Sequence, residues 1–231
     1  MWRALTFRRF QNRKEAGVAG SGVMIGGREE GLSSMAIREV GRHLGEVVVL
    51  EPDVYEDDRG HFMEVFRAES LGPMGVPDRF VQENQSWSRR GVVRGLHFQY
   101  DPPMGKLMRV ISGKALLVAV DIRRGSPTLG RFVAIEASPE NRIQIYAPPG
   151  FARGFCVETE YAEILYKCTA PYNPKGESAI RWNDPRIGIA WPLARPILSP
   201  KDAAAASLSD WLARPESALP AFSVAADRSP G

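Results

Sequence analysis

The stretch KLMRVISGKALLVAVDI, residues 106–122, belongs to a series of β-rich runs that decides the fold. From about residue 45, similar runs precede it (EVVVLEP, HFMEVF, FVQENQSWS, GVVRGLHFQ) and follow it (FVAIEA, RIQIYAP, GFCVETEYAEILYKCTA, SAIRWND). Turn-forming sequences separate the runs, among them DDRG (57–60), SPTLG (126–130) and APPG (147–150). Many strands at short spacing, without intervening helices, predict an all-β antiparallel sandwich or barrel.

The run VRGLHFQ, residues 93–99, holds an arginine and a histidine three positions apart. Side chains of an ideal strand alternate between its two faces, so Arg94 and His97 would lie on opposite faces. They can share a site only if Gly95 bends or bulges the chain. A shared site therefore requires an irregularity at Gly95.

Composition indicates one globular domain and disfavours two classes of protein. The chain has 231 residues, of which 44% are hydrophobic and 25% charged. The net charge of +3 comes from residues 1–35, which hold six Lys/Arg against three acids, whereas the remainder holds 24 of each. A basic surface for nucleic acid is therefore not indicated. No apolar run approaches the roughly 18 to 20 residues of a membrane-spanning helix, so a soluble, cytoplasmic protein is expected.

The sequence divides into three parts. Residues 1–35 include the glycine-rich GVAGSGVMIGG and are predicted to be a disordered N-terminal extension, with a targeting peptide as the alternative. Residues 36–205 form the predicted domain. Residues 206–231 are predicted to hold a short helix and a loose tail, with AAAASLSDWLA as the helical segment. The two cysteines, Cys156 and Cys168, have no metal-binding spacing and are interpreted as buried free thiols.

Several motifs occur in one order along the domain. They are DDRGHFMEVF (57–66), FVQENQSWS (80–88), VVRGLHFQ (92–99), GKLMRVISG (105–113), VDIRRGSPTLG (120–130), PPGFARGF (148–155), YKCTAPYNPKGE (166–177), WNDP (182–185) and LSPKD (198–202). Together they resemble the dTDP-4-dehydrorhamnose 3,5-epimerase family of nucleotide-sugar epimerases, from about residue 46 to residue 205.

The resemblance implies a cupin-type jelly roll with short peripheral helices, a homodimer, and a dTDP-4-keto-6-deoxyhexose substrate. It implies a role in dTDP-rhamnose supply for polysaccharides. The reaction needs no redox cofactor, because a carbonyl at C4 acidifies the protons on C3 and C5 and each can leave to give an enolate. The chain has three histidines, His43, His61 and His97, with no HxH pair, so no metal site is expected.

Four residues match the family's reaction chemistry. His97 matches the general base, and Asp202 matches the carboxylate that orients it. Tyr166 matches the general acid, whose ionisation nearby cations would have to ease. Lys106 matches the lysine near the C4 oxygen. Each also has an ordinary interpretation: a hydrogen-bonded barrel histidine, a helix N-cap, a core tyrosine and a barrel-mouth lysine.

Ten further residues match substrate contacts of the family. Arg59, Arg94 and Lys201 match phosphate or sugar contacts. The other contacts concern the base, the ribose and the sugar, with Tyr172 stacking on the thymine ring. They are Glu64, Gln82, Glu83, Asn84, Arg153, Tyr172 and Glu177. A solvated surface role is the alternative for each, most credible for Glu83 and Glu177.

Two positions depart from the family pattern. Arg153 stands where the best-known members have a sugar-facing histidine, and His61 stands where an aromatic residue is common. The predicted activity is epimerisation at both C3 and C5. The alternatives are a single-centre epimerase of a related dTDP-4-keto sugar and a non-catalytic dTDP-sugar-binding cupin.

Overall fold

The structure is a computed structural model that describes residues 37–219. The predicted extension, residues 1–35, and the end of the predicted tail, residues 220–231, lie outside the described residues. The strands are β1 (Ile37–His43), β2 (Val47–Pro52), β3 (Val54–Asp57), β4 (Gly60–Met63), β5 (Gln82–Arg89), β6 (Val93–Gln99), β7 (Lys106–Asp121), β8 (Phe132–Ala137), β9 (Gln144–Ala147), β10 (Phe151–Cys168) and β11 (Glu177–Ala179). The helices are α1 (Ala68–Leu71), η1 (Gly72–Met74), α2 (Pro200–Ala203), α3 (Leu208–Ala213) and η2 (Pro215–Ala218).

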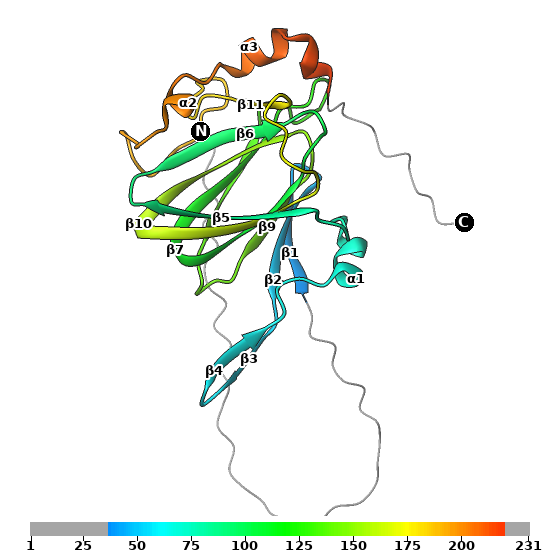
Figure 1. Ribbon diagram of the computed structural model, residues 1–231, viewed down its shortest axis with the longest axis vertical. Helices are drawn as coiled ribbons and strands as arrows, with labels where there is room; N and C mark the ends of the chain where they lie inside the picture. Colours follow the sequence, from blue (N-terminus) through cyan, green and yellow to red (C-terminus); the bar gives the residue numbers. More distant parts are fainter. Residues whose placement is uncertain (1–36, 220–231) are drawn as a thin grey trace, which may run out of the picture. The chain divides into compact units, whose positions relative to one another are not determined.

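Two long strands, β7 and β10, join two antiparallel layers (Figure 1). The first half of β7 and the second half of β10 belong to one layer, in which they pair with β9 and β5; β2 and β1 continue this layer beyond β9. The other halves pair with β8 and β6, and β11 continues beyond β6. The prediction of an all-β cupin-type jelly roll with short helices is confirmed.

Apolar side chains fill the interior and cover the outside of both layers. The interior cluster takes alternate residues of the long strands, as period two requires. A second cluster lies outside the β6 layer and includes Phe98 and the buried Trp211 of α3. A third lies beside β2, where Leu71 of α1 packs. Because both faces of the second half of β7 are covered, residues 115–120 are continuously apolar in sequence.

The segment AAAASLSDWLA forms less helix than the sequence predicts. α2 ends at Ala203, and α3 starts after a capping box between Ser207 and Asp210. Between the two helices, Ala206 forms a parallel β-bridge with Ile180. The tertiary contact therefore overrides the helical preference of the alanines.

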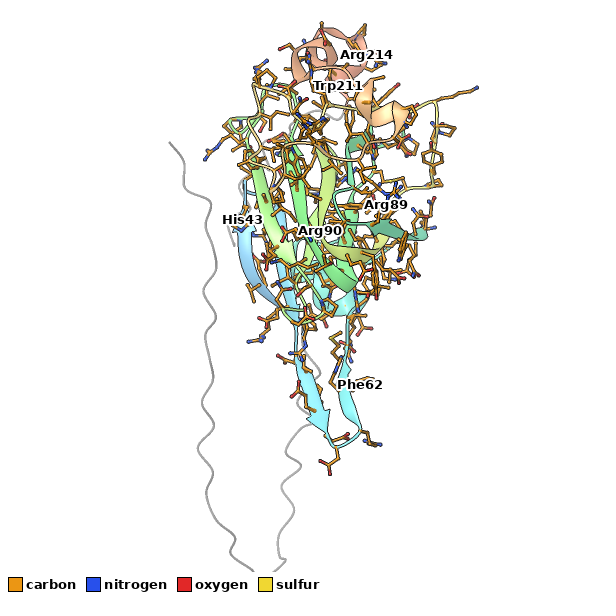
Figure 2. All side chains as sticks on the ribbon, turned by 90° about the vertical axis from the view of Figure 1, so that its left-hand side faces the viewer. His43, Phe62, Arg89, Arg90, Trp211 and Arg214 are labelled. Carbon is orange, nitrogen blue, oxygen red and sulfur yellow. The ribbon has the colours of Figure 1, made fainter. Side chains whose placement is uncertain are left out.

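The DDRG turn closes a hairpin of β3 and β4, which forms a separate two-stranded sheet. In Figures 1 and 2 this hairpin extends beyond the main sheet, with Phe62 on it. Phe62 is 59% exposed, and Tyr55 on the facing strand is also exposed. The hairpin thus presents aromatic side chains that residues 37–219 leave exposed. No helix in residues 37–219 is long and apolar enough to cross a membrane.

Candidate active site

A bulge at Gly95 brings Arg94 and His97 onto one face of β6. Arg94 pairs with Phe155 of β10 and His97 with Arg153, so three steps along β6 match two along β10. Gly95 has φ +124°, and a Cβ there would lie 2.6 Å from the Cα of Gly154. Only glycine fits this crossing without a backbone shift. The irregularity that the sequence requires for a shared site is therefore present.

His97 is held by a buried carboxylate. Its Nε2 lies 2.5 Å from Oδ1 of Asp202, whose side chain is 4% exposed. Ser199, not Asp202, caps α2, because its hydroxyl accepts a hydrogen bond of 3.1 Å from the Asp202 amide. Burial would raise the pKa of Asp202, but hydrogen bonds from His97, Ser199 and the Gly95 amide, with the charge of His97, lower it below 3.8. Asp202 is thus an ionised partner for the imidazole.

The interior face of β5, β10 and β7 carries the other polar candidates in rows. Residues directly opposite each other in antiparallel strands point to the same face. The register gives three such rows, from the polar end inward: Gln82, Cys168 and Lys106; Asn84, Tyr166 and Met108; Ser86, Ile164 and Val110. The third row belongs largely to the apolar interior, so the polar groups gather at one end of it.

Lys106 is a partly desolvated cation beside Tyr166. Its Nζ lies 4.8 Å from the centre of the Tyr166 ring. Burial, followed by the charge of Arg153, lowers the pKa of Lys106 from 10.5 to about 8. Cys168 and Glu177 act in the opposite direction. Lys106 is therefore mostly protonated at pH 7 but titrates close to neutrality.

Tyr166 keeps its proton more firmly than the sequence interpretation assumed. Burial and then Cys168 raise the pKa of Tyr166 above 10, whereas a hydrogen bond with Asn84 and the charge of Arg94 lower it less. The nearby cation therefore does not lower the pKa of the Tyr166 phenol toward 7 in the free protein. Tyr166 is accordingly a protonated hydroxyl that can donate.

Arg153 lies on the interior face opposite His97, and its charge acts on Lys106. It is the cross-strand partner of His97 and is only 4% exposed. Its Nη1 donates to the carbonyl oxygen of Met104 at 2.7 Å. Burial lowers the pKa of Arg153 to about 10, so the guanidinium stays charged at neutral pH.

Five candidates form a polar rim around the site. Gln82 accepts a hydrogen bond of 2.8 Å from the amide of Tyr172 and donates one of 3.0 Å to Asn84. The hydroxyl of Tyr172 donates to Glu177 at 3.1 Å, and Lys201 forms an ion pair with the same carboxylate oxygen. The Tyr172 ring is 54% exposed and free to stack on a planar ligand.

The described part of one chain, residues 37–219, does not bring three of the candidates to this site. Glu83 lies on the opposite face of β5 from its two neighbours and pairs with Lys167 at 2.7 Å. Arg59 lies at the tip of the hairpin, where its side chain is 90% exposed and bonds to Asp57. Glu64 follows β4 and pairs with Arg67 at 2.6 Å. Substrate contacts for these residues stay predictions.

Two site residues were missed in the sequence. Ser86 continues the face of Gln82 and Asn84, and its buried Oγ has no hydrogen-bond partner in the described chain. Cys168 is buried and free, as predicted for both cysteines, but it lies in the polar row and accepts from Asn84 at 3.7 Å. Period-two alternation, extended from the recognised residues, would have identified both.

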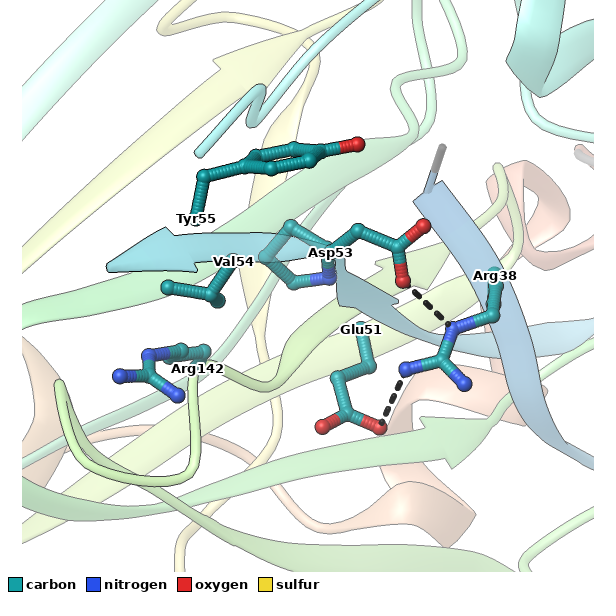
Figure 3. A pocket seen from close by; sticks show the side chains of 7 residues that line it. Arg38, Glu51, Asp53, Val54, Tyr55 and Arg142 are labelled. Carbon is teal, nitrogen blue, oxygen red and sulfur yellow. Dashed lines mark ion pairs between the residues drawn. The ribbon is translucent and has the colours of Figure 1, made fainter. Parts of the chain in front are cut away.

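A hollow lies away from these residues, at the root of the hairpin (Figure 3). It has a volume of about 380 Å³ and a charged lining. Arg38 pairs there with Glu51 and Asp53, at 3.7 and 3.1 Å. Because these charges already satisfy one another, the hollow is a weaker candidate for substrate. Within residues 37–219, no cluster of three His, Cys, Asp or Glu side chains could hold a metal ion.

Comparison with known proteins identifies the family. Residues 42–210 match the family model described as dTDP-4-dehydrorhamnose 3,5-epimerase. The chain belongs to the dTDP-4-dehydrorhamnose 3,5-epimerase family. All candidate site residues lie within the matched range.

Relatives of this epimerase family cover most of the chain. A dTDP-4-dehydrorhamnose 3,5-epimerase of Neisseria gonorrhoeae is 49% identical over 178 residues, 76% of this chain. The chain spans 53%, about half, of the length of that relative. The crystal structure of dTDP-6-deoxy-D-glucose-3,5-epimerase from Legionella pneumophila Philadelphia 1, in complex with dTDP-4-keto-L-rhamnose, is 44% identical with a TM-score of 0.77. That match covers 81% of this chain and 100% of the Legionella chain.

The chain is also similar to an enzyme described as a monoepimerase. The structure of a 3'-monoepimerase from Streptomyces bikiniensis, in complex with dTDP-quinovose, is 34% identical with a TM-score of 0.68. That match covers 72% of this chain and 85% of the Streptomyces chain. Fold similarity alone thus does not fix the number of centres epimerised.

Proposed function

We propose that this chain catalyses cofactor-independent epimerisation at C3 and C5 of dTDP-4-dehydro-6-deoxy-α-D-glucose, giving dTDP-4-dehydro-β-L-rhamnose. The proposal rests chiefly on the His97–Asp202 pair, which shares the interior with Tyr166 and Lys106. These are the groups that proton abstraction beside a carbonyl requires: a base, an acid and a cation near the oxygen. The product would feed L-rhamnose supply for polysaccharides.

The geometry supports His97 as the base. Asp202 engages Nε2, so Nδ1 is the ring nitrogen left to take a proton from carbon. The buried carboxylate fixes the tautomer and stabilises the imidazolium once it forms. The lowered pKa of Asp202 keeps it ionised at neutral pH, as this role requires.

Tyr166 and Lys106 complete the reaction. His97 removes the proton at C3 or C5, and the electron pair of the broken C–H bond moves to the C4 oxygen. Lys106 stabilises the resulting enolate as a cation. Tyr166, which stands on a different strand from His97, returns a proton to the other face of the carbon. The phenolate then takes a proton from solvent, and the imidazolium of His97 releases its proton to solvent, which resets both groups.

The test is deuterium incorporation from D₂O, located by NMR after incubation with dTDP-4-dehydro-6-deoxyglucose. Label at C3 and C5 with inversion is expected. His97→Ala should abolish incorporation, and Tyr166→Phe should prevent inversion, because only the acid is lost. His43→Ala and Tyr161→Phe are the matched controls and should retain activity, since both lie outside the site. Full exchange by both His97→Ala and Tyr166→Phe would refute the mechanism.

The same experiment separates the two alternatives. Label at one carbon would favour a single-centre epimerase, the alternative that similarity to the 3'-monoepimerase supports. Binding of dTDP-sugar with no label would favour a non-catalytic cupin. In that case the His97–Asp202 pair would have no catalytic role.

We further propose that the protein is a cytoplasmic homodimer in which the hairpin of one subunit reaches the site of the other. Arg59 is a predicted substrate contact, yet its hairpin extends beyond the main sheet, and Phe62 on it is uncovered. A second copy would resolve both observations. Light scattering should give a dimer.

Complementation tests the exchange of hairpins. Arg59→Ala and His97→Ala are each expected to be poorly active. Refolded together, they should regain activity, because one of the two mixed sites contains both native residues. A monomer, or no gain on mixing, would contradict the arrangement.

A further inference from the structure

Arg153 is a buried cation that has no carboxylate partner among residues 37–219. Its Nη1 donates to the carbonyls of Met104, at 2.7 Å, and Ala147, at 3.5 Å. Its Nε is buried and has no hydrogen-bond partner among residues 37–219. No carboxylate of that range forms an ion pair with Arg153, whereas the buried Arg123 pairs with Asp121. Burying a charge and an N–H donor unpaired is unfavourable, which points to a partner that arrives with the substrate.

The position of Arg153 limits what that partner can be. The residue lies directly opposite His97 on the interior face, and its charge reaches Lys106. Glu177, the acid that also acts on Lys106, is engaged by Lys201 and Tyr172 at the rim. An anion that forms between the base and Lys106 would therefore meet two cations.

Building on the proposed function, we propose that Arg153 is a second oxyanion donor, whose Nε–H binds the oxygen that becomes negative beside Lys106. When His97 takes the proton from carbon, the electron pair of the C–H bond moves to this oxygen, and no oxidant or reductant is needed. The oxygen accepts a hydrogen bond from Arg153 and the charge of Lys106 together. A donor preorganised in a dry site stabilises the enolate more than the ketone.

The two cations lose their charges at different pH values. Lys106 loses its charge above about pH 8, whereas Arg153 keeps its charge to about pH 10. The groups that face Lys106 are Tyr166, Cys168 and Arg153 of β10 and Glu177 of β11. Of these, Arg153 is the one that opposes its protonation by charge. Removing Arg153 should therefore move the alkaline limb of the rate profile to higher pH.

The test compares Arg153→Gln and Arg153→Lys with the matched control Arg142→Gln. The buried Nε of Arg142 also has no hydrogen-bond partner among residues 37–219, but Arg142 pairs with Glu56 of β3. The measurements are kcat and KM for deuterium exchange from pH 6 to 10, the Kd for dTDP, and thermal unfolding. Arg153→Gln is expected to lower kcat about 100-fold with KM and Kd nearly unchanged. Arg153→Lys keeps the charge but not the planar set of guanidinium donors, and its kcat should fall about tenfold.

The outcomes separate this inference from the proposed function. If the wild type incorporates no deuterium, the proposed function fails, and with it the inference. If the wild type is active and Arg153→Gln retains its kcat, Arg153 only positions the Met104 carbonyl and the inference is overturned. An unchanged alkaline limb in Arg153→Gln would overturn it as well. If Arg153→Gln does not fold, a wild-type kcat in Arg153→Lys would overturn the inference in its place.

Discussion

Replacing Lys106 by methionine is expected to stabilise the protein while removing the cation proposed to bind the enolate. Lys106 is desolvated among interior side chains, and its pKa falls from 10.5 to about 8. Methionine has a similar length and carries no charge into this environment. The substitution therefore removes an unfavourable term of folding without opening a large cavity.

The size of the gain follows from the pKa difference. At about 1.4 kcal/mol per pKa unit, the fall from 10.5 to about 8 corresponds to about 3 kcal/mol. The folded-state pKa is depressed, so the full penalty applies below pH 8, where the lysine is charged in both states. Between about pH 8 and 10.5 the unfolded chain still binds the proton and the folded protein does not, so the penalty shrinks as pH rises. The gain should fall by about 2 kcal/mol from pH 7 to pH 10.

Urea unfolding of the wild type and Lys106→Met at pH 7 and pH 10 measures this gain. Lys167→Met is the control, because Lys167 forms a surface pair with Glu83 that contributes at most about 1 kcal/mol. If Lys106→Met gives no gain in unfolding free energy, or the same gain at both pH values, the argument is refuted. Burial and the charge of Arg153 would then not disfavour the charged form of Lys106.

Three further predictions concern the residues around His97. Asp202→Asn should lower kcat for exchange at least about 100-fold, because the amide can stabilise the wrong tautomer. The pKa of Asp202 is lowered, so its carboxylate stabilises the wild type above pH 3.8 and less as pH falls; urea titrations of Asp202→Asn should lack this acid limb. Gly95→Ala should destabilise the fold by at least about 3 kcal/mol, since its Cβ would collide with Gly154. Gly91→Ala, also at positive φ but facing open space, should lose only about 1 kcal/mol in the same assay.

The strands could be predicted from local pattern, and the same pattern made an irregularity at Gly95 the condition for a site shared by Arg94 and His97, which the family resemblance implied. Period-two alternation also separates Glu83 from Gln82 and Asn84, so the rule itself argues against one shared contact surface for all three. The pairing of Asp202 with His97 was available only through family resemblance, since 105 residues separate them.

The features that the sequence could not predict depend on distant contacts. The lowered pKa of Lys106 requires burial by strands that are remote in the chain, and the position of Arg153 opposite His97 requires the register of β6 and β10. The break between α2 and α3 arises from the bridge of Ala206 to Ile180, which outweighs the preference of the alanine run.

The interior rows have an evolutionary consequence. Met108 and Tyr166 are directly opposite each other, and Ile164 lies one row deeper on the same strand, so the floor of the site consists of core side chains. A conservative substitution at Met108 or Ile164 would change the packing of the barrel. It would also change the local dielectric around the two cations of the site, Lys106 and Arg153. Substitutions in this core should therefore be selected for their effect on catalytic turnover as well as on stability. Lineages that change sugar preference should carry compensating core substitutions beneath the reacting groups.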